Sequence, residues 1–137
     1  MKLKLKISNV LLLMLILISI SATSFAQLNK KLLIGKWLFV TFTLPNQSKT
    51  NDEYLLENNT KYKDVTYVFT KDEFLMQKKN GGENWNKKTK YKLLQDKFIK
   101  LYIGQKTQTM RIDYLDVHTL KIFVEGSEPT GIFKRIE

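Results

Sequence analysis

The chain has 137 residues, no cysteine and one histidine, and its 23 Lys and Arg against 13 Asp and Glu give a formal net charge of +10. The lack of cysteine excludes disulfide scaffolds, thiolate metal sites and a cysteine-linked lipid anchor, and a single histidine excludes a zinc site of three histidines. With 43% hydrophobic and 12% aromatic residues, the composition is typical of a folded protein, and the length predicts one domain.

The first 26 residues have the pattern of a secretory signal peptide. Three lysines within the first six residues precede an apolar run over 10–20, and Ser24 and Ala26 place small residues at the −3 and −1 positions of a cleavage site. The apolar run is shorter than the ~20 residues that a membrane-spanning helix needs. We therefore expect export with cleavage after Ala26. This leaves residues 27–137 as one domain in the periplasm or outside the cell, not lipid-anchored.

After a short apolar segment over 28–34, which predicts a helical turn, the dominant period of the sequence is two. Short alternating runs separated by turn-forming residues are typical of antiparallel strands. Eight strands are predicted, over 36–44, 64–70, 73–79, 87–93, 97–103, 107–114, 118–124 and 131–136. Short connections favour a meander closed into an eight-stranded antiparallel up-and-down β-barrel, because closure leaves no exposed edge. A two-sheet sandwich is the alternative, although it usually needs longer crossovers.

One connection is much longer than the others. Residues 45–63 are mostly polar and are predicted to form a loop. Loops of this length in compact domains are often lids or binding loops, but a disordered surface loop fits the composition equally well. The sequence leaves both interpretations open.

Alternation along the strands also predicts which side chains face the barrel interior. Five aromatic residues on this face are the candidate ligand contacts: Phe39, Tyr67, Phe69, Tyr91 and Tyr114. A two-residue turn before the fifth strand would instead bring Phe98 and Tyr102 inward. We predict a three-residue turn, which keeps Lys90, Lys92 and Lys100 outside. Eight strands leave room either for a small ligand or for a core that these side chains fill, and the sequence favours neither.

The sequence contains no motif for catalysis or metal binding. Nucleophile elbows, His-Glu-x-x-His zinc motifs, glycine-rich phosphate loops and EF-hand calcium loops are missing. His118 lies in a predicted turn, where a surface position is expected. We therefore predict neither an enzyme nor a bound metal or cofactor.

A lysine-rich hairpin is predicted between the third and fourth strands. Its glycine-rich tip contains Trp85, and its strands carry Lys78, Lys79, Lys87, Lys88, Lys90 and Lys92. An aromatic side chain among lysines can contact an anionic surface or a partner protein. The interpretation that we favour is simpler, since lysines also protect a solvated strand face from unwanted pairing. Nucleic acid is not an expected partner, because export and the shortage of arginine argue against it.

A Gly-x-Trp, formed by Gly35 and Trp37, stands at the start of the first predicted strand and follows the helical turn. This arrangement resembles the lipocalin signature, and specifically the small exported bacterial lipocalin-like domains, which are calycin-type barrels. The segment 66–74 is similar to the second hairpin of that group, and 116–122 is similar to its entry into the seventh strand. Arg135 is the basic residue that the family places in its last strand.

The resemblance implies a non-enzymatic barrel that binds or sequesters a small hydrophobic molecule. The alternative is a non-catalytic interaction module with a filled barrel, such as an inhibitor or an envelope-associated scaffold. In either case three residues are expected to close the barrel. Gly35 allows a close backbone approach, Trp37 points inward, and Arg135 stacks on Trp37 and locks the first strand to the last.

Overall fold

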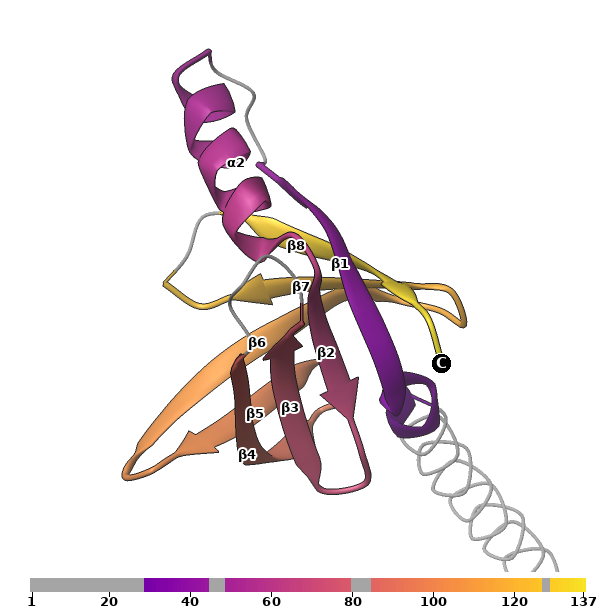
Figure 1. The fold of residues 1–137 in the computed structure, drawn as a ribbon. Helices are drawn as coiled ribbons and strands as arrows, with labels where there is room; N and C mark the ends of the chain where they lie inside the picture. Colours follow the sequence, from indigo (N-terminus) through magenta and orange to yellow (C-terminus); the bar gives the residue numbers. More distant parts are fainter. Residues whose placement is uncertain (1–28, 45–48, 80–84, 127–128) are drawn as a thin grey trace, which may run out of the picture.

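The computed structural model describes residues 29–44, 49–79, 85–126 and 129–137. The predicted signal peptide and the glycine-rich tip of the lysine-rich hairpin lie outside these residues. Each strand of the described chain pairs antiparallel with the next, and the last pairs with the first, so that the sheet forms a closed barrel (Figure 1). The predicted meander is therefore confirmed, and the two-sheet sandwich is excluded.

The eight strands agree with the predicted ones to within two residues at each end. They are β1 (Gly35–Thr43), β2 (Val65–Phe69), β3 (Glu73–Lys78), β4 (Trp85–Leu94), β5 (Phe98–Ile103), β6 (Lys106–Leu115), β7 (Thr119–Val124) and β8 (Thr130–Arg135). The agreement follows from the strict alternation of buried and solvated positions that a closed sheet imposes on every strand.

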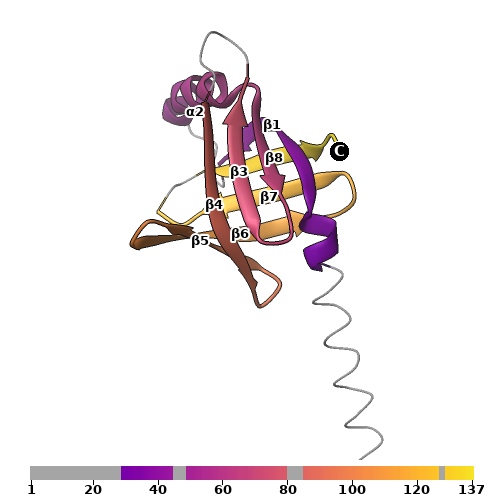
Figure 2. The ribbon, with the colours of Figure 1, turned by 60° about the horizontal axis from the view of Figure 1, so that its bottom comes forward.

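The prediction of a loop over 45–63 is wrong, because most of this segment is the helix α2 (Lys49–Tyr62). Its apolar residues do not gather on one face, so the sequence carries no clear helical stripe. Such a helix depends on tertiary contacts, and near its end Asn59 Oδ1 accepts a hydrogen bond of 2.8 Å from the backbone amide of Phe42. Figures 1 and 2 show α2 beside one end of the barrel. No helix among the described residues combines the length and the apolar character needed to cross a membrane.

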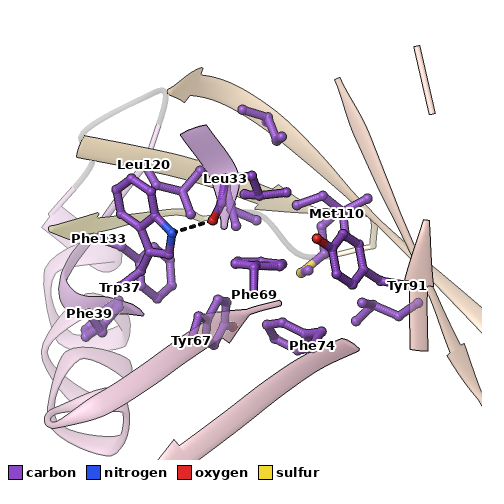
Figure 3. Packing of buried hydrophobic residues seen from close by; sticks show 14 of the residues in the cluster. Leu33, Trp37, Phe39, Tyr67, Phe69, Phe74, Tyr91, Met110, Leu120 and Phe133 are labelled. Carbon is purple, nitrogen blue, oxygen red and sulfur yellow. Dashed lines mark hydrogen bonds between the residues drawn. The ribbon is translucent and has the colours of Figure 1, made fainter. Parts of the chain in front are cut away.

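The opposite end of the barrel is plugged by the predicted helical turn, which spans residues 29–33 (Figure 1). Leu33 and Trp37 are both fully buried there. The indole Nε1 of Trp37 donates a hydrogen bond of 2.9 Å to the carbonyl oxygen of Leu33, which ties the short helix to β1 (Figure 3). The plug and the first strand thus form one packed unit.

The three-residue turn before β5 is confirmed. The turn occupies residues 95–97, and Tyr91 pairs with Leu101 in the adjoining ladder, with both side chains buried. Lys92 pairs with Lys100 on the outer face of the same ladder. The observed register is therefore the predicted one, with the lysines on the outer face.

The inward assignment of Tyr114 is wrong. The register of the β6–β7 ladder shifts between Ile112 and Tyr114, so β6 carries one extra residue there. Such a bulge reverses the face on which the following residues lie. Ile112 is buried, but Tyr114 is 48% exposed, and its hydroxyl donates a hydrogen bond of 2.8 Å to Asp116 Oδ2.

Candidate ligand-binding site

A cavity of about 390 Å³ lies in the half of the barrel nearest α2. Its deepest walls are buried side chains from four strands, namely Tyr67, Phe74, Leu101 and Met110. Small-molecule sites in proteins typically have volumes of roughly 300–1,000 Å³ and mostly apolar walls. The volume and the lining of this cavity both fit a small apolar ligand.

The polar residues of the cavity lie on its more solvated side. They are Asn58 of α2, Lys87, Lys88 and Thr89 of β4, and Gln108 of β6. Lys87, Lys88 and Gln108 are exposed, in contrast to the buried apolar walls. The described residues that line the cavity include two lysines, Lys87 and Lys88, and no carboxylate.

The helix α2 supplies part of the mouth and is anchored to the barrel by its last turn. The ring of Tyr62 packs edge-to-face on Phe42, with centroids 5.1 Å apart, and lies 5.8 Å from the ring of Phe39. Lys78 Nζ donates a hydrogen bond of 3.1 Å to the carbonyl oxygen of Lys61. The sequence analysis missed this contribution to the site, because it treated the whole segment as a loop.

The structure places the five aromatic candidates in three different environments. Tyr67 lines the cavity, whereas Phe39, Phe69 and Tyr91 are buried in the packed core and Tyr114 lies outside. Figure 3 shows Phe69 and Tyr91 among the core side chains, and the Tyr91 hydroxyl donates a hydrogen bond of 2.7 Å to the carbonyl oxygen of Thr70. The barrel is thus hollow at the end nearest α2, and Tyr91 also borders a second, more open pocket beside Lys30 at the plugged end.

Burial changes the ionisation of the two interior tyrosines. Desolvation, and to a smaller extent the neighbouring Tyr62, raise the pKa of Tyr67 well above its ordinary value. Desolvation, with a smaller contribution from Asp72, raises the pKa of Tyr91 to about 12. Tyr67 therefore presents a neutral hydroxyl to the cavity across the physiological pH range.

Arg135 makes the contacts that join the two ends of the chain. Its guanidinium carbon lies 4.2 Å from the ring centroid of Trp37. Its Nη1 donates to the carbonyl oxygen of Ile34 and its Nε to that of Val117, each at 2.9 Å, and its Nη2 donates to the carbonyl oxygen of Leu32. A cation is favourable beside the unpaired carbonyls at a helix C-terminus. One side chain therefore links β8, the plug helix and the β6–β7 turn.

Gly35 makes this arrangement possible. Its φ of +146° lies in a region that residues with a Cβ rarely adopt. A Cβ at this position would overlap the guanidinium of Arg135 and lie 2.7 Å from the carbonyl oxygen of Glu137. The Gly-x-Trp motif thus has a steric cause in this chain.

A closed eight-stranded meander with a helical plug at one end and a cavity at the other defines the class of lipocalin-like barrels, and this chain has that fold. It is similar to the solved structure of a lipocalin-like protein from Bacteroides uniformis, with 19% identity and a TM-score of 0.53. That match covers 76% of this chain and 98% of the other.

A second solved structure, of an uncharacterized protein from Bacteroides eggerthii, is similar as well. It has 16% identity and a TM-score of 0.55, and the match covers 75% of this chain and 98% of the other. No protein-family model and no curated protein sequence matches the chain. At these identities the likeness extends to the fold alone, so the function has to be argued from the site.

Proposed function

We propose that this protein is a non-enzymatic binding protein that holds a small apolar molecule in the open half of its barrel. The observation that carries the proposal is the cavity of about 390 Å³ with buried apolar walls. Protein interiors are normally packed without voids of this size, because unfilled space forfeits dispersion contacts. A ligand that fills the cavity would restore those contacts.

The arrangement of the aromatic residues supports this proposal over a completely filled barrel. Rings from β1, β2, β3 and β8 contact one another with centroids 4.4–5.6 Å apart and pack one side of the interior. Tyr67 and Phe74 belong to this cluster and also line the cavity. The rings therefore form a rigid wall for a ligand, and pre-formed walls lower the entropy cost of binding.

Native mass spectrometry tests the proposal. The exported protein, purified from cells that express the full chain, is incubated with a lipid extract, and the retained molecules are identified. Ile103→Trp replaces an aliphatic side chain at the cavity wall by a bulky indole and should abolish retention of the ligand. Val40→Trp should not, because Val40 does not line the cavity. The two positions are equally exposed, at 51% each, so the variants carry a similar folding risk. Retention of nothing by the parent protein would overturn the proposal.

We further propose that the protein works outside the cytoplasm, in the periplasm or beyond, after cleavage following Ala26. The basic start, the apolar run over 10–20 and the small residues before Gln27 support this location. Fractionation of expressing cells and N-terminal sequencing test it. The expected result is a protein in the exported fraction that begins with Gln27, and a cytoplasmic protein that begins with Met1 would contradict it.

A second candidate function is contact with a protein partner or an anionic surface through the outer face of β4 and β5. Lys92 and Lys100 are direct neighbours across this ladder, and like charges at such positions repel one another. An acidic partner would relieve the repulsion. Pull-down from envelope extracts with Lys90→Glu and Lys92→Glu tests it, since both should weaken capture by this surface, whereas a ligand held only in the cavity should be unaffected.

A further inference from the structure

We propose that the edge of β4 at the plugged end of the barrel binds an extended acidic segment of a partner protein, which adds to the sheet as a short strand antiparallel to β4. This inference deepens the second candidate function, because it names the place on that surface and the chemistry of the partner. It does not depend on a ligand of the cavity. It is carried by an overhang of β4 and by the basic pocket that lies along it.

The strand β4 continues past the end of β3. The β3–β4 ladder ends at the pair of Glu73 and Lys90, so the last four residues of β4, 91–94, lie beyond it (Figure 2). One further hydrogen bond, of 3.1 Å, joins the amide of Tyr91 to the carbonyl oxygen of Asp72. On their other side the same four residues stay paired with β5. The barrel is closed, yet this part of β4 is a strand edge.

The backbone groups of Leu93 point to this edge. The N–H and C=O groups of successive residues in an antiparallel strand point alternately to its two sides. Since the amide of Tyr91 faces the β3 side, the N–H and C=O of Leu93 face that side as well, and those of Lys92 face β5. No described residue pairs with Leu93 on the β3 side. Leu93 therefore offers one donor and one acceptor to an added strand.

A comparable edge on β1 is covered by the chain itself. The β1–β2 ladder ends at Leu38, and beyond it the amide of Phe42 donates a hydrogen bond of 2.8 Å to Asn59 Oδ1 of α2. Strand edges are usually paired, covered or charged, because a bare edge recruits other strands. At the edge of β4 a pocket lies where the covering element would be. Lysines beside such an edge repel basic strands and select acidic ones.

This pocket is the second pocket, at the plugged end of the barrel, and its volume is about 610 Å³. Its lining includes Lys90, Lys92 and Leu93 of β4, Lys30 of the plug helix, Asp72 and Tyr102. Space is therefore open between the edge of β4 and the plug helix. Tyr102 is 37% exposed and is the direct partner of Lys90 in the β4–β5 ladder, so its ring adds an aromatic contact surface beside the lysines.

The charge of the second pocket favours an acidic partner. Three lysines, Lys30, Lys90 and Lys92, line it with one carboxylate among the described residues. Glu73, the direct ladder partner of Lys90, forms its ion pair of 2.9 Å with Lys88. None of the three lysines forms an ion pair with another described residue. A segment with negative charges would relieve their mutual repulsion, and a basic segment would add to it.

The alternation of β4 sets the pattern of the segment. Lys92 is exposed on the outer face, whereas Leu93 is half-buried and packs against the core. A segment that continues the line of β3 runs antiparallel to β4, as β3 does. Directly opposite residues then share a face, and the residue opposite Leu93 exchanges both hydrogen bonds with it. The outward residues of the segment should therefore be acidic and the inward ones apolar.

Calorimetric titration of the protein with capped pentapeptides tests this pattern. Acetyl-Glu-Ile-Glu-Ile-Glu-amide should bind, and its counterpart with lysine in place of glutamate should not. N-methylation of the two isoleucines removes the amides that face the edge and should abolish binding. N-methylation of two glutamates leaves those amides and the charge unchanged and should be tolerated. Equal binding of the two methylated peptides would show attraction by charge alone and would overturn the inference.

Two variants and one amide place the peptide on the protein. Lys92→Gln should weaken binding of the acidic peptide by about two- to fivefold, the range for a solvated ion pair. Lys134→Gln removes an exposed lysine from β8 and should leave the affinity unchanged. Hydrogen exchange at the amide of Leu93 should be fast in the free protein and slow in the complex.

Protection of the Leu93 amide in the free protein, or an equal loss of affinity in both variants, would overturn the inference. Failure of the acidic peptide to bind would overturn it as well. The second candidate function would stand in each case, because capture from envelope extracts decides it separately.

Discussion

Trp37 and Arg135 face one another across the β1–β8 ladder, and the guanidinium carbon of Arg135 lies 4.2 Å from the indole centroid. The same two strands are extended by backbone hydrogen bonds of 2.9 Å that Lys36 exchanges with Ile136 and Glu137. The pair therefore stands where the two ends of the chain meet, and where the barrel would open first if the last strand detached.

Replacing Arg135 by methionine should destabilise the fold by about 2–3 kcal/mol, since the change removes a cation–π contact and hydrogen bonds to four backbone carbonyls. Arg135→Lys should recover only part of the loss, because an ammonium lacks the planar fork of the guanidinium. Urea unfolding measures both. Lys134→Met, at the exposed neighbouring position, should stay within about 0.5 kcal/mol of the parent. Equal effects at the two positions would contradict a closing role for Arg135.

Gly35→Ala should destabilise the protein by about 1–3 kcal/mol, because the added Cβ must be accommodated in an unfavourable backbone conformation and displaces Arg135. Gly104→Ala is the matched control. Gly104 also has a positive φ, of +61°, but a Cβ there meets nothing within 4 Å. Thermal unfolding should therefore show a smaller loss of stability for Gly104→Ala than for Gly35→Ala. The reverse order would mean that the contact with Arg135 is unimportant.

Alkaline pH should destabilise the protein through Tyr91. Burial raises the pKa of Tyr91 to about 12 in the folded state, against 10.0 for the unperturbed side chain. The unfolded chain therefore loses this proton first, and stability falls as the pH rises from about 10 to about 12. Tyr91→Phe should lower stability at neutral pH, because the hydrogen bond to Thr70 is lost, but its alkaline decline should be shallower.

The comparison for the alkaline experiment is Tyr102→Phe, which changes a tyrosine that is 37% exposed on the outer face. Denaturant unfolding at a series of pH values from 7 to 12 gives, for each protein, the slope of the free energy of unfolding against pH. The Tyr102→Phe slope should match that of the parent. A Tyr91→Phe slope as steep as that of the parent would show that Tyr91 is not the group responsible.

Tyr62→Ala should release α2 from the barrel without unfolding the barrel. The tyrosine ring holds the last turn of the helix against Phe39 and Phe42, and such aromatic contacts contribute about 0.5–1.5 kcal/mol each beyond their buried area. Hydrogen exchange should become faster over Lys49–Tyr62 and stay slow in β1 and β8. Leu56→Ala, at a position 69% exposed, should leave the exchange pattern unchanged. Loss of protection throughout the barrel would contradict local anchoring.

The strands could be predicted from the sequence because each contributes alternating side chains to the same interior. Trp37, Tyr67 and Tyr91 are examples, since each is buried at a position that alternation assigns to the inside. The bulge near Tyr114 could not be predicted in this way. The apolar–polar alternation of β6 continues through it, and only the pairing with β7 reveals the extra residue.

Less of the candidate site than of the fold could be predicted from the sequence. Tyr67 and Phe69 lie two residues apart on the same face of β2, yet one lines the cavity and the other packs into the core. Whether an inward side chain lines a cavity or fills it depends on the volumes of its neighbours on other strands. The helix α2 was missed for a related reason, since Asn59 and Tyr62 have contact partners that are distant in sequence.

A crystal structure of the protein grown with decanoate tests the central claim most directly. The account predicts electron density for the alkyl chain of decanoate inside the cavity, between Tyr67 and Met110. A barrel in which side chains close the cavity, with decanoate absent or bound elsewhere, would contradict it.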